Sequence, residues 1–154
     1  LVKILSKINN KNLELLIIGE IEPMLFSKLN IKFKFIKKIS SDEKLNKIYN
    51  LSDILIFPSR QDNLPNVAIE AMSTGLPIIA FNIGGMNDLI KNNYNGYLCN
   101  PFDTNEFSKK LDNLILRKNI RKKFSLNLIN FSKKNFNYNL IGNKYLTYLK
   151  QVKK

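Results

Sequence analysis

Short apolar runs alternate with helical patterns along this chain, and this alternation constrains its fold more than any other feature. The runs predicted as strands are 13–18, 31–36, 53–57, 77–82 and 97–99. The segments predicted as helices are 1–8, 23–29, 41–50, a short helix through 88–90, 103–116, 118–129 and 138–149. Buried strands that alternate with helices are typical of parallel sheets, because parallel strands need long crossover connections. The sequence therefore predicts an α/β fold, a parallel sheet flanked by helices on both faces.

Length and composition predict one domain, 1–154, and exclude several chemistries. A chain of 154 residues and 17.9 kDa has the size of a single domain with one core. Histidine is absent, which removes the usual general base near neutral pH, histidine metal ligands and a Ser-His-Asp triad. Cys99 is the only cysteine, so an internal disulfide is impossible and a reducing compartment is suitable. We therefore expect no histidine or cysteine-rich metal site, and a cytoplasmic location is compatible with the single cysteine.

The net charge of +13 has two interpretations that the sequence leaves open. Most of the basic residues are lysines and asparagine is abundant, which is typical of an AT-rich genome. The alternative is a functional basic surface that attracts anionic lipid or nucleic acid. Its candidate residues are Lys109, Lys110, Lys118, Arg121, Lys122 and Lys123.

The candidate chemistry is concentrated between Phe57 and Gly85. In an open α/β sheet, ligands bind beyond the carboxyl ends of strands, where loop 58–65 is expected. We predict that Asn63 caps the following helix and that Pro65 lies in its first turn. The N–H groups of Asn66 and Val67 would then point into the crevice with the positive end of the helix dipole, as an anion site suited to a diphosphate.

Two acids flank this predicted anion site. Glu70 stands in an apolar helical segment, where a buried charge needs a partner or a ligand. It is about 6 Å further along the helix axis, so its carboxylate could accept hydrogen bonds from a ribose diol. Asp62 precedes the helix and would lie beyond the phosphates, next to a transferred group. The alternatives are that Glu70 pairs with a lysine of the chain and that Asp62 is an ordinary loop residue.

These residues together resemble one family. Its pattern is a strand followed by Pro-Ser, an acid, seven residues, Glu, Ala-Met, Gly, Pro, an apolar strand and Gly-Gly. The chain has Pro58-Ser59, Asp62, Glu70-Ala71-Met72, Gly75, Pro77-Ile78-Ile79-Ala80 and Gly84-Gly85, followed by Asp88, Asn95-Gly96-Tyr97-Leu98, Pro101, Asp103, Phe136, Tyr145 and Tyr148. This combination resembles the C-terminal, donor-binding domain of GT-B retaining glycosyltransferases of family 4, with a Rossmann-like sheet, and covers nearly the whole chain.

The resemblance implies transfer of a sugar from a nucleotide-diphosphate sugar, with the anomeric configuration retained and no required metal. It implies that Glu70 holds the ribose and that Asp62, the candidate catalytic residue, holds hydroxyls of the donor sugar. The backbone of Asn63, Leu64, Pro65, Asn66 and Val67 would hold the sugar and the diphosphate. The segment at Ile36 and Lys37 would flank the base. The sequence pattern favours a UDP-hexose or UDP-N-acetylhexosamine.

The chain departs from the family pattern in ways that affect the expected activity. Asp62 is one methylene shorter than the usual Glu, and Lys37 stands where many members have Gly. In the family, the Arg and Lys that clamp the diphosphate come before the first helix of the donor-binding domain. The N-terminal acceptor domain comes before them. We therefore expect a donor half-site with little turnover alone, because the leaving phosphate needs positioned cations.

The expected partners are the nucleotide sugar and, through the N-terminal domain, a glycan or lipid-linked acceptor. Peripheral contact with the inner face of the membrane is compatible with the basic charge, and we expect no nucleic-acid partner. Two alternatives differ in class. One is a non-catalytic basic domain that binds anionic membrane or nucleic acid. The other is a sugar-nucleotide epimerase of the same fold, which the absence of histidine disfavours.

Overall fold

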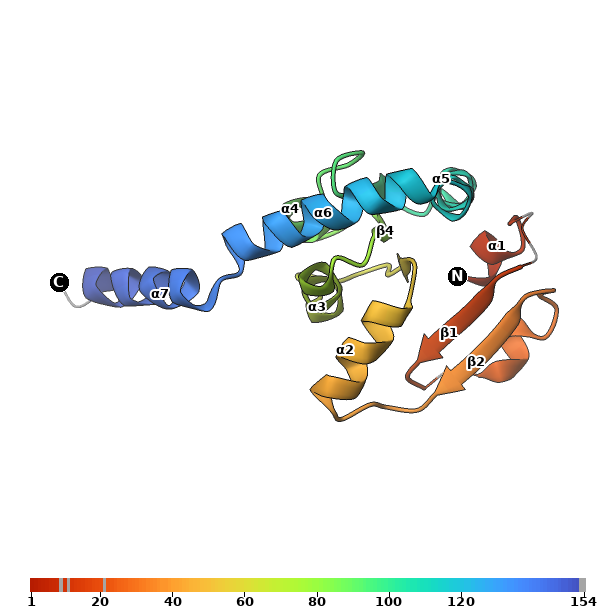
Figure 1. The fold of residues 1–154 in the computed structure, drawn as a ribbon, viewed down its shortest axis with the longest axis horizontal. Helices are drawn as coiled ribbons and strands as arrows, with labels where there is room; N and C mark the ends of the chain where they lie inside the picture. Colours follow the sequence, from red (N-terminus) through yellow and green to blue (C-terminus); the bar gives the residue numbers. More distant parts are fainter. Residues whose placement is uncertain (9, 11, 21, 153–154) are drawn as a thin grey trace.

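The computed structural model describes residues 1–8, 10, 12–20 and 22–152, and it is an α/β structure (Figure 1). Its first part contains α1 (Val2–Leu5), β1 (Glu14–Ile18), the 3-10 helix η1 (Pro23–Phe26), β2 (Lys32–Ile36) and α2 (Asp42–Leu51). Its middle contains β3 (Leu55–Phe57), α3 (Asn66–Thr74), β4 (Ile78–Phe81), α4 (Met86–Leu89) and β5 (Gly96–Cys99). The final helices are α5 (Thr104–Leu116), α6 (Lys118–Asn135) and α7 (Tyr138–Val152).

All five strands of the described residues pair in parallel, as predicted, but they form two hydrogen-bonded sheets. One sheet has the order β1-β2 and the other β3-β4-β5. The alternation predicted for 31–36 is confirmed, since Phe33 and Phe35 are half-buried beside Phe26 while Lys32 and Lys34 are exposed. Ile17 of β1 belongs to the same apolar cluster as β4 residues, so the two sheets share one core.

Strand β4 shows why the sheet is covered on both faces. All four of its residues are buried, and they alternate between two apolar clusters. Ile79 and Phe81 pack with α1 and α5, whereas Ile78 and Ala80 pack with α2, α3 and α4. Because successive side chains of a strand point to opposite faces, this division assigns one helical layer to each face. The predicted α/β architecture with helices on both faces is confirmed.

Ser40 and Glu43 have the spacing of a capping box, which predicts Ser40 as the N-cap of α2. Ser41, not Ser40, is the N-cap, and its hydroxyl accepts from the Lys44 N–H at 3.3 Å. Two consecutive serines satisfy nearly the same capping pattern, and the backbone of the turn selects between them.

Asp103 and Glu106 have the same capping-box spacing, which predicts that α5 starts at Asp103, and this start is confirmed. Asp103 caps the helix and accepts from the N–H groups of Asn105 and Glu106, both at 2.9 Å. The side chain of Glu106 does not accept a hydrogen bond from the N–H of Asp103. Its carboxylate accepts instead from the Asn100 N–H at 2.7 Å and pairs with Lys110 at 2.8 Å.

Replacing Asp103 by Ala should lower the free energy of unfolding by about 1 kcal/mol, because two N–H groups at the start of α5 lose their acceptor. Urea denaturation followed by circular dichroism measures this loss. Ser41→Ala is the matched control, with one longer bond and a smaller expected loss. Equal losses in the two variants would contradict the assignment.

The last helix differs most from expectation. The apolar residues of 138–149 predict a face packed inward, but no residue of α7 is buried. The helix projects away from the rest of the structure, next to the end of α6 (Figure 1). Among the described residues, no helix is long and apolar enough to cross a membrane.

Cys99 is buried in the core, so the reactivity of its thiol tests whether the core stays closed. Burial raises the pKa of its thiol to about 12, so almost no thiolate forms near neutral pH. Because the thiolate is the reactive form, the folded protein should not react with a disulfide reagent at about pH 8, whereas the denatured protein should react completely. Absorbance of the released thiolate measures both reactions. Rapid reaction of the native protein would show that β5 opens far more easily than this packing implies.

Candidate functional site

The candidate site lies at the carboxyl ends of β3 and β4. The loop from β3 to α3 (58–65) and the loop from β4 to α4 (82–85) meet there. The N–H of Gly85 donates to the carbonyl of Asn63 at 2.7 Å, which joins the two loops. This is the edge at which parallel α/β sheets bind ligands.

The two glycines are required by this close approach. A Cβ on Gly84 would lie 1.8 Å from the carbonyl oxygen of Asp62, and a Cβ on Gly85 would lie 2.1 Å from that of Asn63. Gly84 also has φ +56, in the left-handed region that favours glycine. Two adjacent glycines in a sequence predict only a turn, and the structure shows that this pair also supports the loop carrying Asp62.

The N-cap of α3 lies two residues later in the sequence than the predicted N-cap, Asn63. Pro65 is the N-cap residue, and the side chain of Asn63 makes no capping hydrogen bond. The Pro65 carbonyl accepts from Ala68 and Ile69, so its fixed backbone starts the helix without a side-chain cap. The N–H groups of Asn66 and Val67 donate to no protein acceptor within the described part of the chain. These free donors lie at the positive end of the helix dipole, where the sequence predicts an anion site.

Glu70 is exposed, so the prediction that it is a buried charge was wrong. It stands on the outer face of α3, while Ala68, Ala71 and Met72 fill the core. Its partner is Tyr49 of α2, whose hydroxyl donates to Glu70 Oε2 at 2.9 Å. No lysine within the described ranges pairs with Glu70, which differs from the predicted alternative of a lysine partner.

Tyr49 orients the carboxylate without neutralising it. Burial, with added hydrogen bonding to Glu70, raises the pKa of Tyr49 above its usual range, so the phenol remains a donor. Both residues line an open hollow of about 540 Å³ between α2 and α3. One carboxylate oxygen is held by the phenol, and the other, Oε1, has no hydrogen-bond partner among the described residues.

The remaining predicted residues lie at the same sheet edge or beside it. Asp62 is half-buried and Leu64 is exposed, both in the 58–65 loop. Ile36 ends β2 and its carbonyl accepts from the Gly19 N–H at 3.0 Å, while Lys37 is exposed. Within the described ranges, no hydrogen bond or ion pair joins Ile36 or Lys37 to the 58–70 segment.

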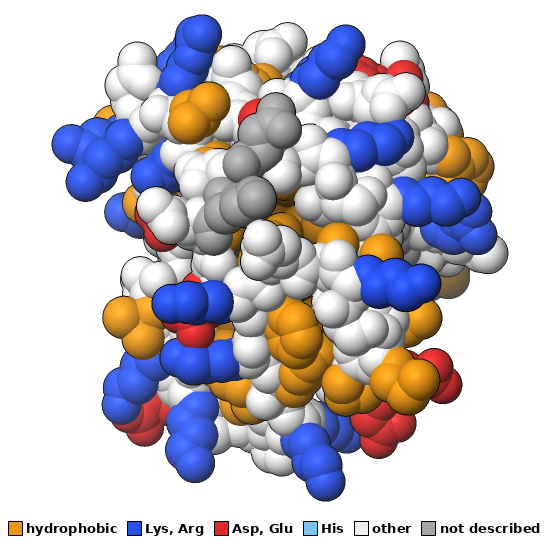
Figure 2. All heavy atoms as spheres, turned by 90° about the vertical axis from the view of Figure 1, so that its right-hand side faces the viewer, with side chains coloured by type: hydrophobic (Ala, Val, Ile, Leu, Met, Phe, Trp, Pro, Cys, Tyr) orange, Lys and Arg blue, Asp and Glu red, His pale blue; other side chains and the backbone are white. Residues whose placement is uncertain are grey.

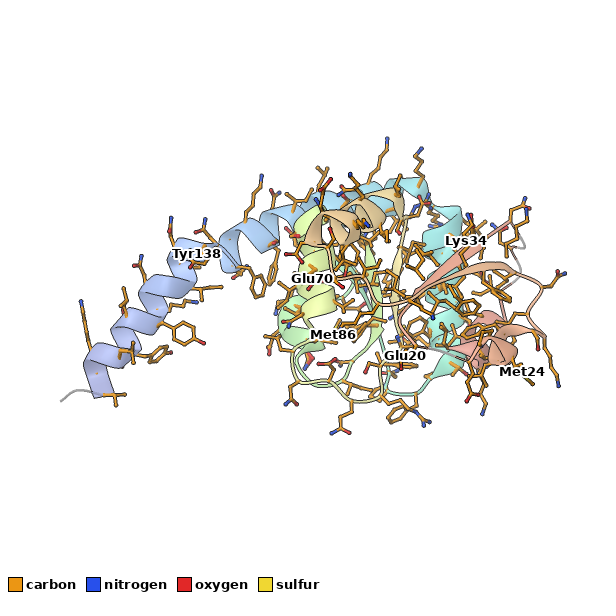
Figure 3. The ribbon with its side chains drawn as sticks, turned by 90° about the horizontal axis from the view of Figure 1, so that it is seen from below. Glu20, Met24, Lys34, Glu70, Met86 and Tyr138 are labelled. Atoms are coloured by element: carbon orange, nitrogen blue, oxygen red, sulfur yellow. The ribbon has the colours of Figure 1, made fainter. Side chains whose placement is uncertain are left out.

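Glu20, which is not among the predicted site residues, follows β1 at this edge of the first sheet. Figure 3 places Glu20 toward the centre of the molecule, whereas Lys34 and Met24 lie at its outer end. Gly19 before it has φ +117, which turns the chain as it leaves the strand. A Gly followed by an acid at a strand end was the available signal.

Arg60 was missed too. Its guanidinium lies 5.4 Å from the ring centroid of Phe102, in the loop after β5, and Phe102 contacts Phe81. Phe102 has φ 64, a conformation that costs energy for a non-glycine residue. This contact puts one cation of the 58–65 loop beside the loop after β5. No local pattern predicts it, because the partners are 42 positions apart.

No group of three or more acidic, cysteine or histidine side chains able to hold a metal ion occurs among the described residues. The site therefore consists of free amides, one oriented carboxylate and a second acid on a loop supported by glycines.

These features define an α/β domain with free amides at a helix N-terminus on the carboxyl edge of a parallel sheet. Residues 1–131 match the family described as glycosyl transferases group 1, and the chain belongs to this family. Its structure is that of the C-terminal half of the GT-B fold, as the sequence resemblance predicted.

Three similar proteins illustrate the match. The chain is 46% identical over 68 residues to an uncharacterized glycosyltransferase of Haemophilus influenzae, which covers 44% of this chain and 19% of that protein. It is 41% identical over 64 residues to the UDP-Gal:alpha-D-GlcNAc-diphosphoundecaprenol alpha-1,3-galactosyltransferase of Escherichia coli, covering 42% and 16%. The crystal structure of Anabaena HepE in complex with UDP superposes with a TM-score of 0.87 at 16% identity, covering 97% of this chain and 44% of that one. The chain thus spans less than half the length of each.

Proposed function

We propose that this chain binds a nucleoside-diphosphate sugar and forms the donor half of a retaining glycosyltransferase. One observation carries the proposal. Two free amides lie at the start of α3, and the carboxylate of Glu70 lies one turn further along the same helix. A diphosphate accepts hydrogen bonds from such amides and is favoured by the helix dipole. A ribose diol donates to a carboxylate at that distance.

Each site residue then has a role. The amides of Asn66 and Val67 bind the diphosphate, with the backbone of Asn63, Leu64 and Pro65 beside them. Glu70 accepts from the ribose hydroxyls through the oxygen that Tyr49 leaves free.

Asp62 and the β2 end complete the proposed donor contacts. Asp62 accepts from hydroxyls of the donor sugar, and its loop is kept close to the sheet by Gly84 and Gly85. Ile36 and Lys37 flank the base.

The proposed donor is a UDP-sugar, and the proposed acceptor is a glycan or a lipid-linked glycan. The structure of HepE contains UDP, and the Escherichia coli relative is named for a UDP-Gal donor and a diphosphoundecaprenol acceptor. Both support this choice for the present chain. A free, buried Cys99 suits a reducing compartment, which supports the proposed cytoplasmic location.

In the proposed reaction, the bond from the anomeric carbon to the phosphate oxygen breaks and the nucleoside diphosphate leaves. The acceptor hydroxyl forms the new bond on the same face of the sugar, and its proton passes to an oxygen of the leaving diphosphate. The residues of this chain bind and orient the donor, and no metal is required in the proposal. Turnover also needs positioned cations for the leaving phosphate and a bound acceptor, so little turnover is proposed for residues 1–154 alone.

Isothermal titration of the chain with UDP, UDP-glucose, ADP-glucose and GDP-mannose tests the proposal. We expect saturable binding with a preference for the uridine nucleotides and no effect of chelator. The same titration with a longer protein that contains this chain provides the decisive comparison. Absence of saturable binding by that protein would overturn the proposal.

A further inference from the structure

Phe102 has a backbone conformation that phenylalanine disfavours. It follows Pro101 in the turn from β5 to α5, where the N–H of Asp103 donates to the carbonyl of Asn100 at 3.1 Å. Its φ is 64, in the left-handed region that turns normally fill with glycine or asparagine at this position. A bulky side chain in this conformation costs energy, and such strain is typical of functional positions.

Neither the turn nor burial explains a phenylalanine at position 102. The other non-glycine residue with a positive φ in the described ranges is Asn93, whose short polar side chain tolerates that conformation. The ring of Phe102 contacts Phe81 with 6.1 Å between the centroids, yet Phe102 is 54% exposed. Burial therefore offsets only part of the strain, and the contact that remains to be explained is the one with Arg60.

Arg60 is the cation that lies over the Phe102 ring, with its Cζ 5.4 Å from the centroid. Lysine and arginine side chains are spread over the face shown in Figure 2, so charge alone does not distinguish Arg60. Lys110 also lies over a ring, that of Tyr97, but it forms an ion pair with Glu106 as well. Arg60 forms no ion pair with any residue of the described ranges, so the ring is its main contact there.

This contact holds the loop that carries Asp62. The hydroxyl of Ser59 donates to the carbonyl of Gln61 at 3.1 Å, which closes a turn around Arg60. Asp62 follows this turn directly, and its carbonyl oxygen lies against Gly84. The loop is therefore held on one side of Asp62 by the aromatic ring and on the other by the glycine pair.

We propose that Arg60 and Phe102 are positioning residues for Asp62, which they keep where its carboxylate accepts from hydroxyls of the donor sugar. The inference rests on the proposed function, in which Asp62 binds that sugar. A carboxylate binds a hydroxyl only over a narrow range of distances, so a loop held at two points keeps this contact better than a loop held at one. The energy of the strained turn is then used to place the ring under Arg60.

Isothermal titration with UDP-glucose tests the inference, with UDP as the reference that lacks the sugar. Arg60→Gln should lower the affinity for UDP-glucose about fivefold and change that for UDP by less than about twofold, because an exposed cation–π contact is weak and the nucleotide contacts stay. Arg60→Lys keeps a cation for the ring and should lose less than about twofold. Arg117→Gln, which removes an exposed arginine at the start of α6, is the matched control and should change neither affinity.

The ring is tested by Phe102→Asn, which removes it and supplies a residue suited to φ 64. This variant should lose about fivefold in UDP-glucose affinity, as Arg60→Gln does, without a lower midpoint of urea denaturation. Asn93→Gly, at the other positive φ, should change neither affinity. A lower midpoint for Phe102→Asn with an unchanged ratio of the two affinities would show that the ring only packs against Phe81.

A positioning role also requires that the losses act through Asp62. The double variant Arg60→Gln/Phe102→Asn should lose no more than either single variant, because both remove one contact. In the Asp62→Ala background, Arg60→Gln should have almost no further effect on UDP-glucose affinity.

The inference is overturned if Arg60→Gln lowers both affinities equally, if it lowers neither, or if its effect persists in the Asp62→Ala background. The proposed function fails separately. If neither UDP nor UDP-glucose binds to a longer protein that contains this chain, the donor site itself is wrong. If both bind and Arg60→Gln leaves the ratio of their affinities unchanged, only the role of Arg60 and Phe102 is wrong.

Discussion

Replacing Glu70 by Gln is expected to lower the affinity for UDP by about a hundredfold. Loss of the charge weakens the hydrogen bonds that the carboxylate accepts from the ribose, a loss of about 3 kcal/mol. The fold should be unchanged, because Glu70 is exposed and an amide oxygen still accepts from Tyr49. Isothermal titration with UDP measures the affinity, and urea denaturation checks the stability.

The matched control is Glu43→Gln, which removes the same charge from the same hollow. Glu43 pairs with Lys47 on the surface of α2, so its loss should change UDP affinity by less than about twofold. Tyr49→Phe should give an intermediate loss, since the carboxylate keeps its charge but loses the donor that orients it. If Glu70→Gln bound UDP as tightly as Glu43→Gln, the assigned role of Glu70 would be wrong.

Replacing Gly84 by Ala is expected to reduce both stability and donor binding. The new Cβ would overlap the Asp62 carbonyl oxygen, and the backbone there has φ +56. Relief requires the loop carrying Asp62 to move, so we expect a loss of about 3 kcal/mol in unfolding free energy and at least about a tenfold loss in UDP affinity. Urea denaturation and isothermal titration measure the two quantities.

Gly142→Ala provides the control for this substitution. Gly142 lies inside α7, and a Cβ there would meet no atom within 4 Å. Because Ala favours a helix more than Gly does, this variant should be unchanged or more stable by up to about 1 kcal/mol. Similar behaviour of the two variants would show that the contact between the 58–65 and 82–85 loops contributes little.

The parts of the fold that could be predicted from the sequence depend on local patterns. The strands were predicted because their apolar runs and alternation reflect burial directly, as the four buried residues of β4 illustrate. Helix starts were less certain. Ser40 and Ser41 satisfy similar capping patterns, and at α3 Pro65 starts the helix without any side-chain cap.

The parts of the site that could not be predicted depend on contacts between distant segments. Tyr49 and Glu70 are 21 positions apart, and the glycine pair contacts Asp62 and Asn63 from another loop. The exposure of Glu70 could not be inferred from its apolar neighbours, because they pack on the opposite side of a helix whose orientation the core decides.

The sequence by itself determined the class of fold, because strand and helix patterns alternate along the chain. It also determined the family and the order of the site residues from Asp62 to Glu70, because these depend on spacing along one loop and helix. Only the tertiary structure decided which side of α3 faces solvent, what Glu70 binds within the chain and why Gly84 and Gly85 must be glycine. It also decided that no residue of α7 is buried in this structure. The physical reason is that burial and contact depend on how helices pack against the sheet, and one helical period is compatible with more than one partner.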